Sequence, residues 1–231
     1  MSIKYVVFDW DGTLADTYPV ISAAYDHTFD TLGLPRIPYD EVKRITSTLQ
    51  NKDTLGAVFG ERKEEAAAAY YDFIGRHHAT SLEAMPGART VLEFCRRQGL
   101  KSFLITNKKT RYVAEEIRHL GFENLFDKVV AAGEYAEDKP HPLATHAVFG
   151  GRLPPADEIL VLGDGAADFQ TARTYDHDSK TARCIIYDPK GKYQGAAPDH
   201  KVTDLTAVIT IIEKVNNPCK KIKILPSPVR D

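Results

Sequence analysis

Acidic side chains follow two apolar runs of the chain at short, regular spacing. Asp9 and Asp11 stand two residues apart after "IKYVVF", and Asp164 and Asp168 stand four apart after "EILVLG". Carboxylates that converge repel one another and need a counter-charge. Oxygen ligands with no His or Cys among them favour Mg²⁺, which binds a few carboxylates together with water and phosphate oxygens. The four residues therefore predict a magnesium site that receives an anionic ligand.

A second set of polar residues follows other apolar runs. Thr106 and Asn107 come directly after "KSFLI", and Lys139 in "EDKPHP" follows the "KVVAAG" run. Ligands of an open parallel sheet bind beyond the carboxyl ends of its strands, so these side chains are expected to meet the acidic ones there. Lys139 would offset part of their charge. Taken alone, Thr106 and Asn107 fit a strand-ending turn equally well, and Lys139 fits a surface position before a proline-bounded turn.

The spacing around Trp10 predicts opposite directions for neighbouring side chains. Successive side chains of an extended backbone alternate between its two sides. Asp9 and Asp11 would then point into the crevice, while Trp10 faces away from it. Gly12 follows at the point where the chain must turn out of the sheet, and glycine permits the backbone conformation that such a turn requires.

Five short apolar runs provide the strands that would position these residues. Continuous apolarity over such runs is typical of strands buried on both faces. Stretches with helical periodicity, such as "ARTVLEFCRRQ" and "RYVAEEIRHL", separate the runs. This alternation predicts an α/β fold with a doubly wound, mostly parallel sheet. The runs cover residues 3–8, 101–105, 128–132, 158–162 and 183–187.

The first two strands are separated by far more residues than one crossover helix needs. Helical patterns over residues 18–33, 39–49 and 64–78 fill this interval and predict a helical insertion above the sheet. The C-terminal stretch "NNPCKKIKILPSPVRD" contains prolines and basic residues that are typical of a loosely held tail. We therefore expect a discontinuous core domain at residues 1–16 and 83–215, a helical cap at 17–82 and a tail at 216–231.

Composition argues against several classes of function. Hydrophobic residues make up 43% of the 231-residue chain, which supports a packed core, and a formal net charge of −2 lacks the basic surplus of nucleic-acid-binding proteins. No apolar stretch reaches the roughly 18 residues of a membrane span, and the N-terminus has no signal-peptide pattern. Cys95, Cys184 and Cys219 are an odd, widely spaced set that indicates reduced thiols. We expect a soluble, cytoplasmic monomer or homodimer that binds neither nucleic acid nor membranes.

Four sequence motifs resemble, in this order, those of the haloacid dehalogenase (HAD) superfamily. They are "DWDGTLADT", "LITNK", "KPHP" and "GDGAAD", and the match spans residues 3–172. The long interval after the first motif resembles the subgroup with a helical, C1-type cap, and the layout is most similar to the phosphoglycolate phosphatase branch. The resemblance implies a Rossmann-like core and a Mg²⁺-dependent phosphatase that hydrolyses a small phosphorylated metabolite through an aspartyl-phosphate intermediate.

The resemblance also implies roles for individual residues. Asp9 would be the nucleophile that accepts the phosphoryl group, and Asp11 would protonate the leaving oxygen and then deprotonate water. Thr106, with Asn107 beside it, would bind the substrate, and Lys139 would hold Asp9 and the phosphate. A carboxylate that attacks a phosphate dianion meets like-charge repulsion, so physical chemistry also requires a cation and hydrogen-bond donors at this place.

The same resemblance assigns the metal ligands. Asp164 would bind Mg²⁺ together with Asp9 and the backbone carbonyl of Asp11, and Asp168 would help to hold the metal site. A dinucleotide-binding loop is the rival interpretation of "GDGAAD", because its Gly-x-Gly spacing lies between a strand and a helix. The third glycine is missing, and Asp168 in its place would repel a pyrophosphate at the start of the helix. We therefore favour the metal site.

Substrate specificity is expected from the inserted cap, which in similar proteins closes over the site. The segment "KRITSTLQNKD" lies where such proteins often place a turn that faces the substrate. Arg44, Thr46, Ser47 and Lys52 are therefore predicted to meet a polar or anionic leaving group. A solvent-exposed helix face explains these four residues equally well.

Two other functions would use the same motif residues. A phosphosugar mutase would employ Asp9 and Asp11 but would return the phosphoryl group to the sugar instead of to water. A non-catalytic binding module would keep the fold without turnover, although the presence of all the motif residues argues against it. The segment after the fourth motif, "TARTYDHDSKTARCIIYD", departs from the family pattern because it is longer, polar and without a glycine turn.

Overall fold

A six-stranded sheet forms the centre of the computed structural model, which describes residues 2–47 and 53–218. The strand order is β5-β4-β1-β6-β7-β8, and every adjacent pair is parallel. The predicted doubly wound α/β fold is therefore confirmed. The strands are β1 (Tyr5–Phe8), β4 (Lys101–Lys109), β5 (Lys128–Ala132), β6 (Ile159–Gly163), β7 (Arg183–Tyr187) and β8 (His200–Val202).

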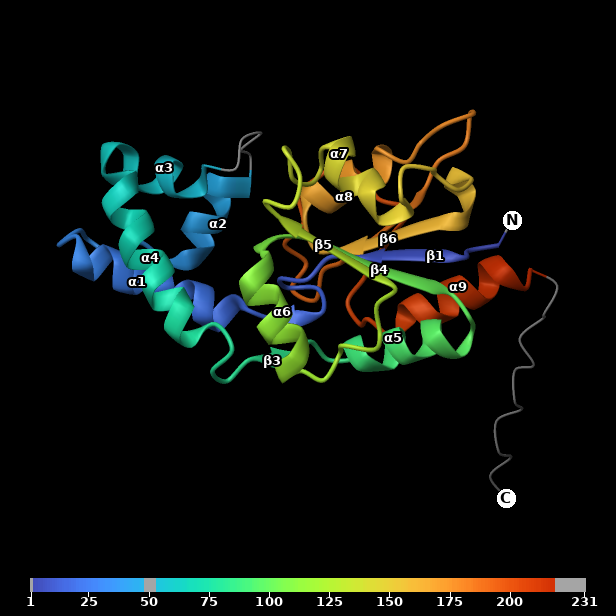
Figure 1. The fold of residues 1–231 in the computed structure, drawn as a ribbon, viewed down its shortest axis with the longest axis horizontal. Coiled ribbons are helices and arrows are strands. Elements are labelled where there is room, and N and C mark those ends of the chain that lie inside the picture. The colour runs from blue at the N-terminus through green and yellow to red at the C-terminus, as the bar shows by residue number, and fades with distance from the viewer. Residues whose placement is uncertain (1, 48–52, 219–231) are drawn as a thin grey trace, which may run out of the picture.

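Helices cover both faces of this sheet. Successive side chains of a strand point to opposite faces, so each strand contributes to two separate cores. Val6 and Phe8 of β1 belong to one buried cluster, and Val7 belongs to the other. Each such side chain stabilises the fold by roughly 1.5–3 kcal/mol when it is fully buried. In Figure 1 the helices below the sheet are α5 (Ala88–Arg97), α6 (Thr110–His119) and α9 (Ala207–Asn216), and those above it are α7 (Pro142–Thr145) and α8 (Ala166–Arg173). Two 3-10 turns, η2 (His146–Phe149) and η3 (Ala156–Glu158), lie between α7 and β6.

A helical lobe, here called the cap, is inserted between β1 and β4 and has an apolar core of its own. Tyr25 and Phe29 of the first cap helix belong to the same buried cluster as Phe59 and Ala66 of the later ones. Figure 1 shows this lobe at one end of the molecule, beyond the carboxyl ends of the strands. Its elements are α1 (Tyr18–Thr31), α2 (Tyr39–Ser47), α3 (Thr54–Phe59), the 3-10 turn η1 (Gly60–Arg62) and α4 (Lys63–His77).

Two short strands connect the cap to the core. β2 (Ala15–Asp16) pairs antiparallel with β3 (Glu83–Ala84). The chain therefore enters and leaves the cap side by side. We propose that this pair forms the boundary between the two domains.

The structure contains elements that the sequence patterns do not predict. Strands β2, β3 and β8 and helix α3 are too short to show a periodic pattern. Strand β4 runs to Lys109, beyond the apolar run that ends at Ile105, and its pairing with β5 shifts register between these two residues. The hydrophobic pattern does not reveal this extension, because the added residues are polar.

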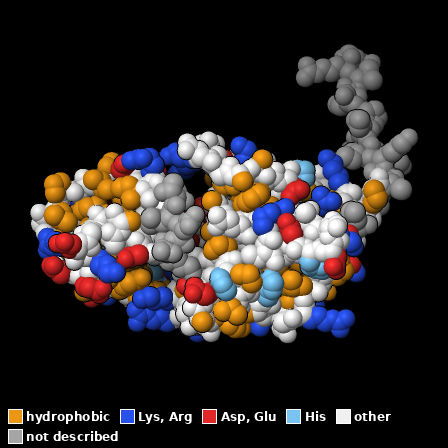
Figure 2. Space-filling view, turned by 90° about the horizontal axis from the view of Figure 1, so that it is seen from above, with side chains coloured by type: hydrophobic (Ala, Val, Ile, Leu, Met, Phe, Trp, Pro, Cys, Tyr) orange, Lys and Arg blue, Asp and Glu red, His pale blue; other side chains and the backbone are white. Residues whose placement is uncertain are grey.

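Charged side chains of both signs are interspersed on the face of the molecule that Figure 2 shows. Among the helices of the described residues, none combines the length and the apolar character needed to cross a bilayer. Cys95 and Cys184 are buried and free, and Cys219 lies outside the described residues.

Candidate active site

Three aspartates meet where the central strands β1 and β6 end. Carboxylate oxygens of Asp9, Asp164 and Asp168 lie within 4.8 Å of one another, an arrangement that could hold a metal ion. Asp9 directly follows β1 and Asp164 directly follows β6, its parallel neighbour. Asp168 lies in the first turn of α8 and is buried, as is Asp9. This acid cluster is the grouping expected at the carboxyl edge of a parallel sheet.

Lys139 is buried against the acid cluster. Its Nζ donates a hydrogen bond to Asp9 Oδ1 and, at 2.8 Å, another to Asp168 Oδ1. Asp168 Oδ2 accepts a 3.0 Å hydrogen bond from the backbone N–H of Gly165, so this carboxylate holds both the lysine and the loop after β6. Burial lowers the pKa of Lys139, but the two carboxylates outweigh burial and raise the pKa above its ordinary value. The lysine is therefore a cation fixed beside Asp9.

The acid cluster carries more negative charge than its buried position favours. Burial raises the pKa of Asp9 from 3.8 to about 8, and the neighbouring carboxylates add to this effect while Lys139 opposes it. Burial and the charge of Asp168 also raise the pKa of Asp164, to about 6. Thr13 Oγ1 donates a 3.1 Å hydrogen bond to Asp9 Oδ2. A divalent cation would relieve the remaining repulsion, because it stabilises the ionised carboxylates.

Asp11 stands apart from the acid cluster and has an ion pair of its own. Its Oδ1 lies 2.7 Å from Lys108 Nζ, and its side chain is 31% exposed. Trp10, between the two aspartates, is fully buried and donates from Nε1 to Glu116 at 2.6 Å. Trp10 is buried as expected, but it and Asp11 both reach the Glu116–Lys108 pair, so the predicted convergence of Asp9 and Asp11 on one crevice stays a prediction. No sequence pattern singles out Lys108 or Glu116, although Lys108 directly follows the predicted site residue Asn107.

The end of β4 supplies Thr106 and Asn107. Thr106 is buried, and its Oγ1 accepts a 3.0 Å hydrogen bond from the backbone N–H of Lys108. Asn107 Nδ2 donates to the backbone carbonyl of Lys139 at 3.1 Å and thus fixes the loop that carries this lysine. The substrate contacts of Thr106 and Asn107 stay a prediction.

Gly12 lies where the chain leaves β1 and passes close to Asp164. Its φ of +79° lies in the left-handed region, and a Cβ at this position would come within 2.7 Å of Asp164 Oδ2. The glycine is therefore required both by the backbone conformation and by the close approach of a carboxylate of the acid cluster.

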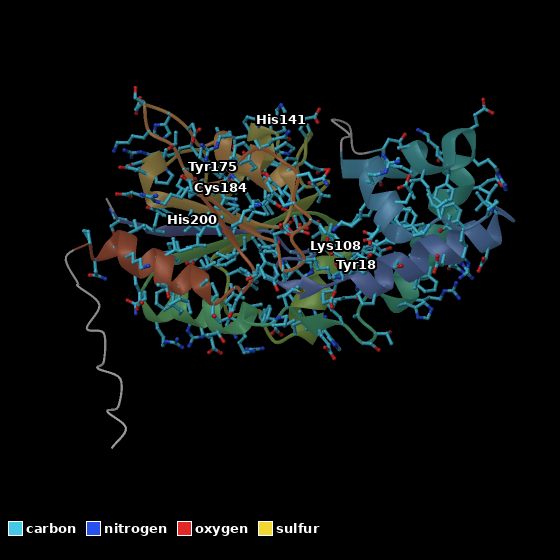
Figure 3. All side chains as sticks on the ribbon, turned by 180° about the vertical axis from the view of Figure 1, so that it is seen from behind. Tyr18, Lys108, His141, Tyr175, Cys184 and His200 are labelled. Atoms are coloured by element: carbon cyan, nitrogen blue, oxygen red, sulfur yellow. The ribbon has the colours of Figure 1, made fainter. Side chains whose placement is uncertain are left out.

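The cap reaches the acid cluster through Lys43 of α2. Its Nζ lies 3.8 Å from Asp164 Oδ2, and its side chain is half exposed. A second contact between the lobes joins Lys192, in the loop after β7, to Asp40 of α2 at 2.7 Å. The hydroxyl of Tyr18 also donates to Asp40, and Figure 3 places this tyrosine where the cap meets the sheet. The cap therefore brings a cation to the open side of the acid cluster.

Two of the four cap residues predicted to face a substrate have described side chains. Arg44 is 73% exposed and donates from Nε to Glu41 at 2.8 Å. Thr46 Oγ1 donates to a backbone carbonyl one turn earlier in α2. The substrate contacts of all four stay a prediction, and the described α2 residue that reaches the acid cluster is instead Lys43. The residues outside the described side chains are Ser47 and Lys52.

Comparison with known proteins finds relatives with similar sequences and similar folds. The profile of the haloacid dehalogenase-like hydrolase family matches residues 6–180. A phosphoglycolate phosphatase of Aliivibrio fischeri is 28% identical over 185 residues, which cover 74% of this chain and 80% of that protein. The crystal structure of a predicted phosphoglycolate phosphatase from Haemophilus somnus has a TM-score of 0.77 at 20% identity and covers 91% of this chain and 98% of its own. The structure of the HAD-hydrolase YfnB of Bacillus subtilis, bound to magnesium, has a TM-score of 0.70 at 16% identity. The match covers 92% of this chain and 100% of YfnB. At these identities the likeness to solved structures shows the fold alone.

Proposed function

Because the chain belongs to the haloacid dehalogenase-like hydrolases, we propose that it is a Mg²⁺-dependent phosphatase that hydrolyses a small phosphorylated metabolite through an aspartyl-phosphate intermediate. The observation that carries this proposal is the acid cluster, in which the buried Lys139 holds Asp9 and Asp168 beside Asp164. The relatives named phosphoglycolate phosphatase support the same class of reaction.

The donor set of the acid cluster fits Mg²⁺. Its described side chains offer only carboxylate oxygens, which are the ligands that this ion prefers. We propose that Asp9 and Asp164 bind the ion with the backbone carbonyl of Asp11, while Asp168 holds Lys139 and supports the metal site. Bound Mg²⁺ would neutralise charge between the nucleophile and the substrate phosphate. The magnesium-bound B. subtilis relative supports this choice of ion.

Gly12→Ala is expected to raise the Mg²⁺ concentration that the enzyme needs. The new Cβ would displace the Asp164 carboxylate from its place in the acid cluster and would strain the backbone by about 1 kcal/mol. Gly33→Ala is the matched control, because Gly33 has a similar φ of +64° but a Cβ at that position would have no other atom within 4 Å. Titration of activity with Mg²⁺ should show a several-fold higher half-saturating concentration for Gly12→Ala only. Equal shifts in both variants would mean that backbone strain alone is responsible.

Asp9 is the proposed nucleophile. A carboxylate about 4 Å from a phosphate oxygen meets a repulsion of roughly 4 kcal/mol for each pair of unit charges at an effective dielectric constant of about 20. The Nζ of Lys139 reduces this repulsion, because it is held on Asp9 and carries a positive charge. Thr106 would donate to the equatorial phosphoryl oxygens, and Thr13 fixes the second oxygen of Asp9. An aspartyl-phosphate then divides the hydrolysis into two easier displacements.

Asp11 is the proposed acid and base, because its partly exposed carboxylate lies two residues beyond the nucleophile. It would protonate the leaving oxygen and then take a proton from the water that attacks the aspartyl-phosphate. Asp11→Asn should therefore lower kcat for an alkyl phosphate by at least about 10²-fold, the usual effect of losing general acid catalysis. A rate close to that of the wild type would remove Asp11 from this role.

The substrate is proposed to be small and anionic beyond its phosphate. Lys43 brings a positive charge from the cap to the acid cluster, 3.8 Å from Asp164. If Asp164 binds a cation, Lys43 is left to attract a carboxylate or a second phosphate of the leaving group. A leaving group of this kind fits phosphoglycolate, the substrate that the names of the relatives give.

The proposed function is tested with the purified full chain and a panel of phosphomonoesters. Released phosphate is measured with Mg²⁺ for 2-phosphoglycolate, sugar phosphates and neutral alkyl phosphates, and Asp9→Asn serves as the inactive control. We expect the highest kcat/KM for a small anionic ester. Conversion of a hexose phosphate into an isomer without free phosphate would instead indicate a mutase. Absence of phosphate release above the control for every ester would contradict the proposal.

A further inference from the structure

A lysine that the mechanism does not yet use is buried between two carboxylates. Lys108 Nζ lies 2.7 Å from Asp11 Oδ1 and 2.9 Å from Glu116 Oε1, and only 9% of the lysine side chain is exposed. Figure 3 shows Lys108 where the cap meets the sheet. The ammonium group is therefore shared between the proposed acid and a second carboxylate that lies outside the acid cluster.

Glu116 on α6 is a rigid support for this lysine. Its side chain is fully buried, and it accepts hydrogen bonds on both oxygens. Trp10 Nε1 donates to Oε2 at 2.6 Å, and His78 Nδ1 lies 3.1 Å from Oε1. A buried carboxylate with this many partners has little freedom to move. Lys108 is consequently held by a fixed carboxylate in addition to Asp11.

The support extends into the cap. His78 directly follows α4, the last helix of the cap, and is itself buried. Its second ring nitrogen, Nε2, lies 2.9 Å from Glu115 Oε2 of α6. The imidazole thus spans two successive glutamates of the core. A continuous row of polar contacts runs from the cap through Glu116 and Lys108 to Asp11.

We propose that Lys108 is a positioning residue that fixes the carboxylate of Asp11 for proton transfer to the leaving group. The inference rests on the proposed function, in which Asp11 is the acid. Asp11 is about one-third exposed, and without the lysine its side chain could rotate toward solvent. Lys108 binds one oxygen of Asp11 and leaves the other for the substrate. A misplacement of a catalytic group by about 1 Å can cost roughly 10²-fold in rate.

The inference is tested with Lys108→Met and two esters that differ in their need for an acid. p-Nitrophenyl phosphate releases a stable anion without protonation, whereas an alkyl phosphate such as 2-phosphoglycolate does not. The quantity compared is kcat/KM, which reports the steps up to the release of the leaving group. We expect a loss of about 10- to 100-fold for the alkyl ester and a much smaller loss for the aryl ester.

Two further variants make the experiment decisive. Lys108→Met alone leaves Glu116 as a buried charge without its cation, which could prevent folding. The double variant Lys108→Met/Glu116→Gln removes both charges and should fold, yet it still leaves Asp11 without its lysine. The matched control is Lys109→Met, since this neighbouring lysine lies 3.5 Å over the ring of Tyr71 in the cap and pairs with neither carboxylate. Its ratio of aryl to alkyl kcat/KM should stay within about twofold of the wild-type ratio.

Each outcome has a distinct meaning. A rise of about tenfold or more in the aryl-to-alkyl ratio, in the single or the double Lys108 variant, supports the positioning role. The alternative is that Lys108 merely neutralises Glu116. In that case kcat/KM would fall equally for both esters, together with the melting temperature, and the inference would be overturned. Partial recovery of the wild-type ratio by Lys108→Arg, which keeps a cation between the carboxylates, is expected. Failure of the wild type to hydrolyse any ester of the panel described above would instead contradict the proposed function, and the inference that rests on it would fail with it.

Discussion

Replacement of Asp9 by asparagine is expected to abolish phosphate release, with a loss of at least about 10⁴-fold in kcat. The amide cannot attack the phosphorus atom, so the aspartyl-phosphate does not form. The effect should be the same for aryl and alkyl phosphates, because the nucleophile acts before any difference between leaving groups matters. The measurement is the release of phosphate, together with acid-quench detection of phosphorylated protein, which we expect in the wild type only.

The fold should survive this substitution. The amide oxygen of an asparagine can accept the hydrogen bond from Lys139 while its N–H₂ group donates to the Thr13 hydroxyl, and burial, which raises the pKa of Asp9 to about 8, already disfavours the charge that the substitution removes. We therefore expect a melting temperature at least as high as that of the metal-free wild type. Asp16→Asn is the matched control, because Asp16 is an exposed aspartate in the nearby strand β2. Retention of one-tenth of the activity or more by Asp9→Asn would exclude Asp9 as the nucleophile.

The acid cluster could be predicted because Asp9 and Asp164 directly follow strands and Asp168 lies in the first turn of the helix after β6. Parallel neighbours such as β1 and β6 end at the same edge, so Asp9 and Asp164 must lie close together once both strands are recognised. Strong continuous apolar runs mark both strands, and the polar residue after each run is therefore placed without knowledge of side-chain packing. Lys139 is placed less directly, because it lies in the loop between β5 and α7 and not at the end of the strand.

The residues that hold Asp11 in place, Lys108 and behind it Glu116 and His78, could not be predicted from strand ends. Glu116 lies on α6 and His78 directly follows α4, so their partners depend on how α4 and α6 pack against the end of the sheet. A buried glutamate looks like a surface residue in a sequence, since glutamate is common on exposed helix faces. Lys108 is likewise one of two successive lysines, and only the three-dimensional structure shows that Lys108 turns inward while Lys109 contacts the cap.

The sequence also does not show which residue of α2 reaches the acid cluster, Lys43 or Arg44. The two residues are adjacent on α2, so they point in directions about 100° apart. Lys43 reaches the acid cluster, whereas Arg44 pairs with Glu41 and is largely exposed. The rotation of α2 relative to the core decides between them. That rotation is set by the docking of the cap and leaves no mark in the local sequence.

Removal of Mg²⁺ is the second large effect that we expect, and it should depend on pH. EDTA should abolish phosphate release, and added Mg²⁺ should restore it. In the metal-free protein the pKa of Asp9 is about 8 and that of Asp164 is about 6, both above the ordinary 3.8. These carboxyl groups must lose their protons when they bind a cation. The affinity for Mg²⁺ should therefore fall by up to about tenfold for each pH unit below 8, and more steeply below 6.

The raised pKa of Asp9 also determines whether a rise in pH stabilises or destabilises the metal-free protein. Between the unfolded pKa near 4 and the folded value of about 8, the folded chain binds more protons at Asp9 than the unfolded chain does. The metal-free protein should accordingly lose stability as the pH rises through this window, and Mg²⁺ should raise the melting temperature more at pH 8 than at pH 6.

Trp10 provides the measurement of affinity, since it is the single tryptophan of the chain and lies between Asp9 and Asp11. Titration of its fluorescence with Mg²⁺ at several pH values gives the dissociation constant directly. In the Asp9→Asn variant the affinity for Mg²⁺ should no longer change between pH 8 and pH 6, because the proton that Mg²⁺ displaces in this range belongs to Asp9. Wild-type affinity that stays constant over this range would show that the acid cluster is already ionised without metal, and the electrostatic reason for a cation at this site would then be lost.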